Sequence, residues 1–413
     1  MYPGCQMATA RYGSTTRWVY PILCFFITFL GGTIYSYSII GYELQKQWGV
    51  SATEAGIPYF AYLCAYGYLM LLGGVLEKRF RSEKVPLFLG ALFFGLGLIG
   101  ASFIDKNVSL FSALFFVAGV GVALMDSMTL PIAASWVPDK PGLAIGIARA
   151  GFGIASLVAA PLFEYLFRVY GFSTGIRIVG IAFLVAALTL AYLTKMNPAS
   201  REIQKQENLG ESLRVVLSRG CFWIIWVLYF AGLFTPLAYV GYVKQIGVEL
   251  ASIDPQVMGY TIAIFSVFNG VGRVLYGKVI DLKGFLFAAS INYASAILAL
   301  TALWLYPSQV VFLLASPIIY LSLGGWLVIA PTEARRITSQ ERFSLSWPLL
   351  MTGYATAVFV GTLATGIIRD VVGGFQAVFP VFIAITVVIG LIPTYTIYRR
   401  ACSMNRRMGS FNG

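Results

Sequence analysis

Long uncharged, apolar runs dominate this sequence. Residues Trp18 to Tyr42 and Leu110 to Met125, for example, include no charged side chain. Apolar runs of about 18 or more residues can cross a membrane as helices, and shorter runs reach that length with their flanks. The pattern predicts an all-α integral membrane protein with twelve transmembrane helices, at 18–42, 55–76, 85–104, 109–134, 142–167, 173–194, 220–243, 256–280, 285–305, 308–331, 344–369 and 375–398.

The predicted helices fall into two groups of six. The longest polar segment of the chain separates them, and leucine and valine recur in it at helical spacing, which predicts an amphipathic helix on the membrane surface. We therefore expect two pseudo-symmetric six-helix bundles. The predicted organisation is an N-terminal tail at 1–17, a first bundle at 18–194, a linker at 195–219, a second bundle at 220–399 and a C-terminal tail at 400–413.

Lysine and arginine placement predicts the orientation in the membrane. With a cytoplasmic N-terminus, most of the 29 lysines and arginines fall in cytoplasmic segments. Cytoplasmic loops are enriched in these residues, so we expect both termini to be cytoplasmic. The net charge of +12 is then a topology signal and does not predict nucleic-acid binding. The small size and short tails favour a prokaryotic cytoplasmic membrane.

Composition excludes several kinds of chemistry. Charged residues make up 11% of the chain, against about 25% in soluble domains. Histidine is absent, which removes imidazole ligands and imidazole proton relays. The 5 cysteines are an odd number and do not predict a disulfide framework. We expect no cofactor, no metal site and no enzymatic activity, since no phosphate loop or nucleophile–base pair is evident.

A short motif occurs once in each half. "GGVLEKRFR" ends the second predicted helix and places Gly73 four residues before Glu77. "GKVIDLKG" ends the eighth and places Gly277 four residues before Asp281. A glycine lets neighbouring helices approach closely, and the acid can face a helix N-terminus. These four residues are predicted to form a gating motif.

With this repeat, the chain resembles the major facilitator superfamily over nearly its whole length. The first copy departs from the superfamily pattern at Phe80, where a glycine is expected, and the second copy keeps Gly284. Three stretches narrow the resemblance to the oxalate/formate antiporter family and the related proton-linked monocarboxylate transporters. They are "GGTIYSYSIIGYELQKQWGVS", "WVPDKPGLAIGIARAGFG" and "FNGVGRVLYGKVIDLKG".

Small residues form a stripe along the fifth predicted helix. Close contact between small side chains drives helix association in lipid, so the stripe predicts either a permanent packing seam or a smooth surface facing the other half. The resemblance favours the second interpretation, because the superfamily places helices 2, 5, 8 and 11 between its halves. The stripe comprises Gly142, Gly146, Ala150, Gly153 and Ser156, and the eleventh helix has a matching set in Gly353, Ala357, Gly361 and Ala364.

Arg273 lies well inside the eighth predicted helix. An arginine near the bilayer centre costs roughly 2.5–3.5 kcal/mol on insertion scales, so it should face a cavity or a partner. Asn269 lies one turn earlier on the same face, and a guanidinium fits a carboxylate bidentately. We expect these two residues to bind a substrate carboxylate; the alternative is an internal salt bridge. The resemblance implies the same role for Arg273.

Asp126 and Arg149 lie at similar distances before and after the turn between the fourth and fifth predicted helices. They should therefore share a depth on adjacent helices and form an ion pair. A protonatable acid with a competing partner can couple proton movement to transport. The alternative is that Arg149 is a second substrate ligand.

The resemblance also bears on the substrate. Oxalate exchangers supply a second cation on the eleventh helix, but this helix has no lysine, and the corresponding position is about Tyr354. One deep cation in the second half suits one carboxylate. Tyr35 and Tyr320 are further candidates for the binding pocket, since each combines an aromatic face with a polar tip at mid-depth.

These observations predict a secondary transporter that moves a small monocarboxylate of the lactate or pyruvate type by alternating access, with proton symport. Its partners would be the organic anion, protons and the lipid bilayer, with no nucleic acid, and it would work as a monomer. Two alternatives stay open: an organic anion exchanger of the oxalate/formate type, and a transporter-like receptor or sensor.

Overall fold

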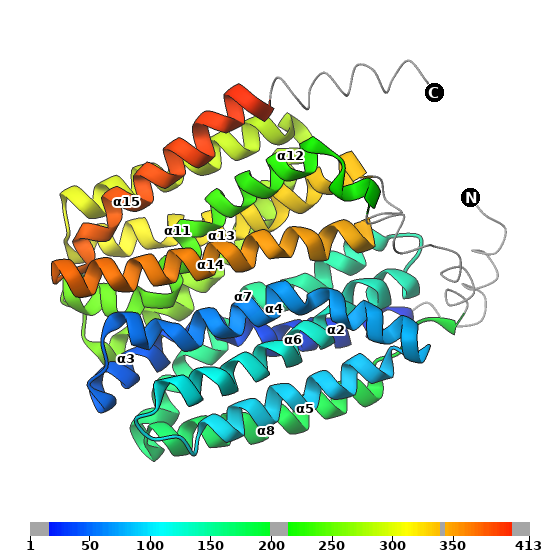
Figure 1. Cartoon of the computed structure of the whole chain (residues 1–413), viewed down its shortest axis with the longest axis horizontal. Helices are drawn as coiled ribbons and strands as arrows, with labels where there is room; N and C mark the ends of the chain where they lie inside the picture. Colours follow the sequence, from blue (N-terminus) through cyan, green and yellow to red (C-terminus); the bar gives the residue numbers. More distant parts are fainter. Residues whose placement is uncertain (1–15, 199–213, 339–342, 399–413) are drawn as a thin grey trace.

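The computed structural model describes residues 16–198, 214–338 and 343–398, and all its elements are helical (Figure 1). The predicted C-terminal tail, all but the last two residues of the predicted N-terminal tail and most of the linker lie outside these residues. The first half contains α2 (Thr16–Gly32), η1 (Thr33–Ser36), α3 (Tyr37–Trp48), α4 (Ala52–Phe80), α5 (Lys84–Ala101), α6 (Val108–Trp136), α7 (Pro141–Tyr170) and α8 (Phe172–Leu193). The second contains α11 (Gly220–Ala251), α12 (Pro255–Leu305), α13 (Gln309–Thr338), α14 (Phe343–Val372), η3 (Phe375–Ala377), α15 (Val378–Ile385), η4 (Thr386–Leu391) and η5 (Thr394–Tyr398).

Gly284 divides the longest helix into two spans. By length and composition, 11 helices of the described residues could cross a membrane, and one of them is the 51-residue α12. Gly284 has φ 82° and ψ 174°, a conformation that glycine alone adopts readily. Tyr276, before this break, and Asn292, after it, both contact Gly325 of α13. The chain therefore reverses at Gly284, which yields the twelve spans predicted from the sequence.

The two halves form two bundles that lie side by side in Figure 1, α2–α8 below and α11–α15 above. Between them α4 packs against α14, and α7 packs against α12. The expectation that helices 2, 5, 8 and 11 separate the halves agrees with this arrangement. We call the end of the molecule that holds Asp139 and Gly284 the terminal end, and the end that holds Gly49 and Ser252 the distal end.

The two small-residue stripes have different environments. Gly153 of α7 faces Arg273 across the interface, whereas Gly142 and Gly146 have open space beside them. On α14, Gly353 lies against Trp226 and Gly361 against the backbone of Phe234, both on α11. Gly353 and Gly361 therefore pack within the second half, and the expectation that these two glycines face the other half was wrong. The rotation of a helix about its axis decides which neighbour its small residues face, and the spacing of those residues along the sequence does not specify that rotation.

Candidate functional site

A cavity of about 630 Å³ lies between the two halves. Helices α7, α12, α13 and α14 contribute most of its lining, together with Tyr35 of η1 and Tyr66 of α4. Gly142 at the start of α7 and Arg335 near the end of α13 both line it, so it reaches the terminal end. Among the residues that the structure describes, its lining contains four cationic residues and no acidic residue: Arg149, Arg273, Lys278 and Arg335.

Polar contacts between the halves close the distal end. Lys244 Nζ of α11 lies 2.6 Å from Glu164 Oε2 of α7, and the Lys244 side chain is fully buried. Asp370 of α14 accepts the backbone N–H groups of Ala52 and Thr53, both at 2.9 Å, at the start of α4. These groups would lack partners at a helix N-terminus, where the helix dipole also favours a carboxylate. The cavity is thus open toward one end and sealed at the other.

Arg273 lies on α12 at its contact with α7. Its Nη1 donates to the backbone oxygen of Arg149 at 2.8 Å, and its Nε donates to Asn269 Oδ1 at 3.3 Å. A Cβ added at Gly153 would lie 3.1 Å from Arg273 Nε, so the glycine leaves room for the guanidinium. No carboxylate of the described residues forms an ion pair with Arg273. Since a guanidinium has five N–H donors, donors remain for a ligand in the cavity.

Asp126 and Arg149 are ion-paired. Arg149 Nη1 lies 2.6 Å from Asp126 Oδ2, with Asp126 buried and Arg149 at the cavity wall. Tyr66 donates to the same Asp126 oxygen at 2.7 Å, and Thr129 donates to the other at 2.9 Å. The Arg149 guanidinium also lies 5.2 Å from the centre of the Trp347 ring. The fourth and fifth helices therefore bring the two charges together at one depth; whether the pair couples protons stays a prediction.

Tyr35 and Tyr354 meet across the interface. Their hydroxyls lie 3.1 Å apart, and both residues line the cavity. The 3₁₀ turn η1 interrupts the first span at Tyr35, whose ring packs against Phe152 at 5.2 Å. Tyr66 lies nearby, with its ring centre 6.0 Å from that of Tyr354. The two predicted tyrosines thus contribute hydroxyls to one wall from opposite halves.

The other predicted pocket residues are placed differently. Asn269 is buried and reaches the site through its hydrogen bond to Arg273. Tyr320 does not line the cavity: it is buried inside the second half, where its ring lies 5.7 Å from that of Phe265. Mid-depth position identified Tyr320 as a candidate, but its side chain is buried outside this cavity.

The predicted gating residues lie toward the terminal end. Gly73 packs against Ser127 of α6, and Gly277 lines the cavity. Asp281 pairs with Arg336 of α13 at 3.2 Å, which ties α12 to α13 within the second half. Glu77 is near the end of α4. Their gating role stays a prediction.

Sequence reasoning missed several residues of this arrangement. Tyr66 and Trp347 surround the Asp126–Arg149 pair, but no spacing along the chain connects them to it. Lys244 was assigned to a loop beyond the seventh helix, whereas it lies inside α11, which extends to Ala251. Lys278 and Arg335 were not among the predicted pocket residues, although both line the cavity. The one available signal was Lys244, a lysine that directly follows a long apolar run.

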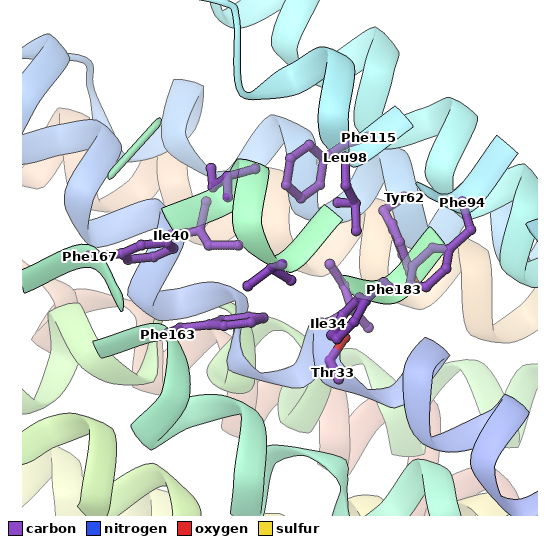
Figure 2. Close-up of a pocket in the computed structure, with 12 residues that line it drawn as sticks. Thr33, Ile34, Ile40, Tyr62, Phe94, Leu98, Phe115, Phe163, Phe167 and Phe183 are labelled. Carbon is purple, nitrogen blue, oxygen red and sulfur yellow. The ribbon is translucent and has the colours of Figure 1, made fainter. Parts of the chain in front are cut away.

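A second, much smaller cavity lies inside the first half. Its volume is about 30 Å³, and rings including Phe94, Phe163 and Phe183 surround it (Figure 2). Thr33 and Tyr62 are its polar residues. Its described lining residues carry no charge and it has room for about one water molecule, so it does not suit an organic anion.

The comparisons with known proteins agree with this architecture. The family model described as Major Facilitator Superfamily matches residues 22–335. The chain belongs to the Major Facilitator Superfamily. It is therefore a multi-pass membrane protein of a transporter family, and its apolar helices agree with this.

Relatives within the superfamily include carriers of organic anions. The chain is 24% identical over 375 residues to the oxalate:formate antiporter of Oxalobacter formigenes, covering 88% of each protein. It is 25% identical over 387 residues to monocarboxylate transporter 4 of Gallus gallus, covering 88% of this chain and 79% of the relative. The resemblance inferred from the sequence is thereby confirmed.

Solved structures share the fold. A bacterial homologue of the human lysosomal transporter Spinster, in an inward-facing and unoccupied conformation, aligns with a TM-score of 0.72 at 14% identity, over 96% of this chain and 99% of the homologue. A D-xylose–proton symporter aligns with a TM-score of 0.69 at 16% identity, over 91% of this chain and 98% of the symporter.

Proposed function

We propose that this transporter carries a small monocarboxylate of the lactate or pyruvate type, with a proton, by alternating access. The observation that carries the proposal is Arg273: a guanidinium without an ion-pair partner among the described residues, at the wall of the cavity between the halves. It would bind the carboxylate bidentately, with Asn269 holding its Nε in place. Tyr35 and Tyr354 would donate further hydrogen bonds.

Charge supports one carboxylate rather than two. Arg149 is the nearest other cation, and Asp126 offsets its charge. Proton symport would neutralise the transported anion, and Asp126 is the buried acid next to the cavity. We further propose that the protein works as a monomer in a prokaryotic cytoplasmic membrane, with both termini cytoplasmic.

Exchange of oxalate and formate is the second candidate. Arg149 lines the same cavity as Arg273, and a relative is an oxalate:formate antiporter. If Arg149 left Asp126, two guanidinium groups could bind a dicarboxylate.

Uptake of radiolabelled L-lactate into proteoliposomes tests the proposal. An inside-alkaline gradient should drive accumulation, and Arg273→Ala should reduce uptake about tenfold or more, because charge-assisted hydrogen bonds contribute roughly 1.5–3 kcal/mol. Arg177→Ala is the matched control, since Arg177 lies outside the cavity and bonds to Ser102. Uptake that ignores the gradient but appears with oxalate or formate inside would establish exchange instead.

A further inference from the structure

The cationic lining of the cavity extends well beyond Arg273. Lys278 follows Arg273 by five residues on α12, which is about 7.5 Å along the helix axis toward the terminal end. Arg335 lies on α13, and Pro331 and Thr332, one turn before it, line the same cavity. Basic groups therefore occur at the wall of the cavity from its interior to its mouth.

The cationic residues at the terminal end differ in whether they form ion pairs. Arg336, the residue after Arg335, pairs with Asp281 at 3.2 Å and with Glu333 at 3.5 Å. Neither Lys278 nor Arg335 forms an ion pair with a carboxylate of the described residues. Asp281 and Glu333 thus pair with Arg336, which does not line the cavity, while Lys278 and Arg335 have no ion-pair partner within the described part of the chain.

Topology alone does not explain these two charges. Cytoplasmic lysines and arginines ordinarily anchor helix ends at lipid headgroups. Lys278 and Arg335 instead contribute to the wall of a space shared by both halves. A cleft lined by one sign of charge with low-dielectric walls focuses the field and concentrates ligands of the opposite sign.

We propose that Lys278 and Arg335 form a second anion-binding subsite at the mouth of the cavity, which we call the mouth subsite. Its ligand is a small organic carboxylate, held there before it reaches Arg273 and again as it leaves. The mouth subsite rests on the proposed carriage of an anion and adds a binding step to it. Thr332, beside Arg335, offers a hydroxyl to the same ligand.

Transport kinetics test the mouth subsite. In K278Q/R335Q, the KM for L-lactate at low ionic strength should rise about three- to tenfold, because long-range attraction is lost. The substitutions should change KM and leave the maximal rate unchanged. The difference in KM should disappear near 0.5 M salt, where screening shortens the Debye length to about 4 Å. Lys283→Gln is the control: it removes one positive charge from an exposed position on α12 outside the cavity, and it should leave the KM at low ionic strength unchanged.

A second measurement does not depend on the substrate. Gly146 lines the cavity, and a Cβ there would meet nothing within 4 Å, so Gly146→Cys presents a thiol inside the cavity. We define the reagent ratio as the rate at which an anionic methanethiosulfonate modifies this thiol, divided by the rate for a cationic one. The reagent ratio should be several-fold lower in the K278Q/R335Q background than in the protein that keeps Lys278 and Arg335. The protein without Gly146→Cys corrects for the natural cysteines.

The outcomes separate the two proposals. An unchanged reagent ratio, or a KM and salt dependence equal to those of the native protein, would overturn the mouth subsite. If the native protein carries no monocarboxylate but the reagent ratio falls in the variant, the proposed substrate is wrong and the mouth subsite stands for another anion.

Discussion

At the scale of single residues, the environment of Asp126 is the most informative. A buried carboxylate accepts from Arg149, Tyr66 and Thr129, and two of these donors share one oxygen. Breaking a buried ion pair by removing one partner leaves a lone charge, whereas removing both charges can be nearly neutral. This difference allows a structural role to be distinguished from proton coupling.

Asp126→Asn should uncouple uptake from the proton gradient, because an amide cannot take up and release a proton as the Asp126 carboxyl can. It should also destabilise the protein by about 3 kcal/mol, since Arg149 loses its counter-ion. The measurement is L-lactate uptake at several imposed pH gradients, with thermal unfolding of the purified protein alongside.

The matched variant is D126N/R149Q, which removes both charges and should recover most of the stability. If the double variant transports without responding to the gradient, the pair couples protons. Full gradient dependence in the double variant would assign coupling to another group and leave Asp126 a structural role.

At the scale of elements, the contact between α7 and α12 determines the geometry of the site. Gly153 allows Arg273 to lie against α7, and Gly324 of α13 contacts the backbone of Asn269 and Arg273 from another side. Arg273 is therefore held between two helices whose glycines permit close approach. Its orientation depends on residues that touch no substrate.

Gly153→Leu should abolish uptake while the protein still folds, because a side chain there must displace the Arg273 guanidinium. Gly74→Leu is the control, since a Cβ at Gly74 meets nothing within 4 Å. Uptake by both variants should be compared at equal amounts of folded protein, judged by size-exclusion profile. Native-like uptake in Gly153→Leu would show that the position of Arg273 does not limit transport.

At the scale of the whole molecule, alternating access requires the sealed distal end to open. Lys244 is fully buried between Glu164 and the Tyr42 ring, 2.6 Å and 4.8 Å away, and both partners belong to the other half. Opening must separate these groups and detach Asp370 from the start of α4. A buried ion pair across the moving interface therefore favours the distally closed state.

Glu164→Gln should increase the distally open population, because the ion pair that links the halves is lost. Electron–electron distance measurements between spin labels at Lys46 and Gln256, exposed positions on opposite halves at this end, would detect a longer-distance population. Glu249→Gln is the control, as Glu249 pairs with Arg369 within the second half. Equal distance distributions in Glu164→Gln and the native protein would contradict the role of the pair.

The sequence by itself determined the features that depend on local composition. Twelve spans and two halves follow from the length of apolar runs, because the bilayer has a defined thickness. Arg273 and the Asp126–Arg149 pair were recognisable because burying a charge within a membrane span is costly on any face of the helix. Gly284 was visible as part of a motif, and the backbone at that position requires a glycine.

Only the tertiary structure decided which face of each helix meets the cavity. It brought Tyr66, Lys278 and Arg335 to the cavity lining, buried Tyr320 outside that lining, and paired Lys244 with Glu164. The reason is physical: lipid tails are as apolar as helix interfaces, so hydropathy does not distinguish them. Helix rotation and tilt depend on packing between distant segments, and that packing places the charges that act together.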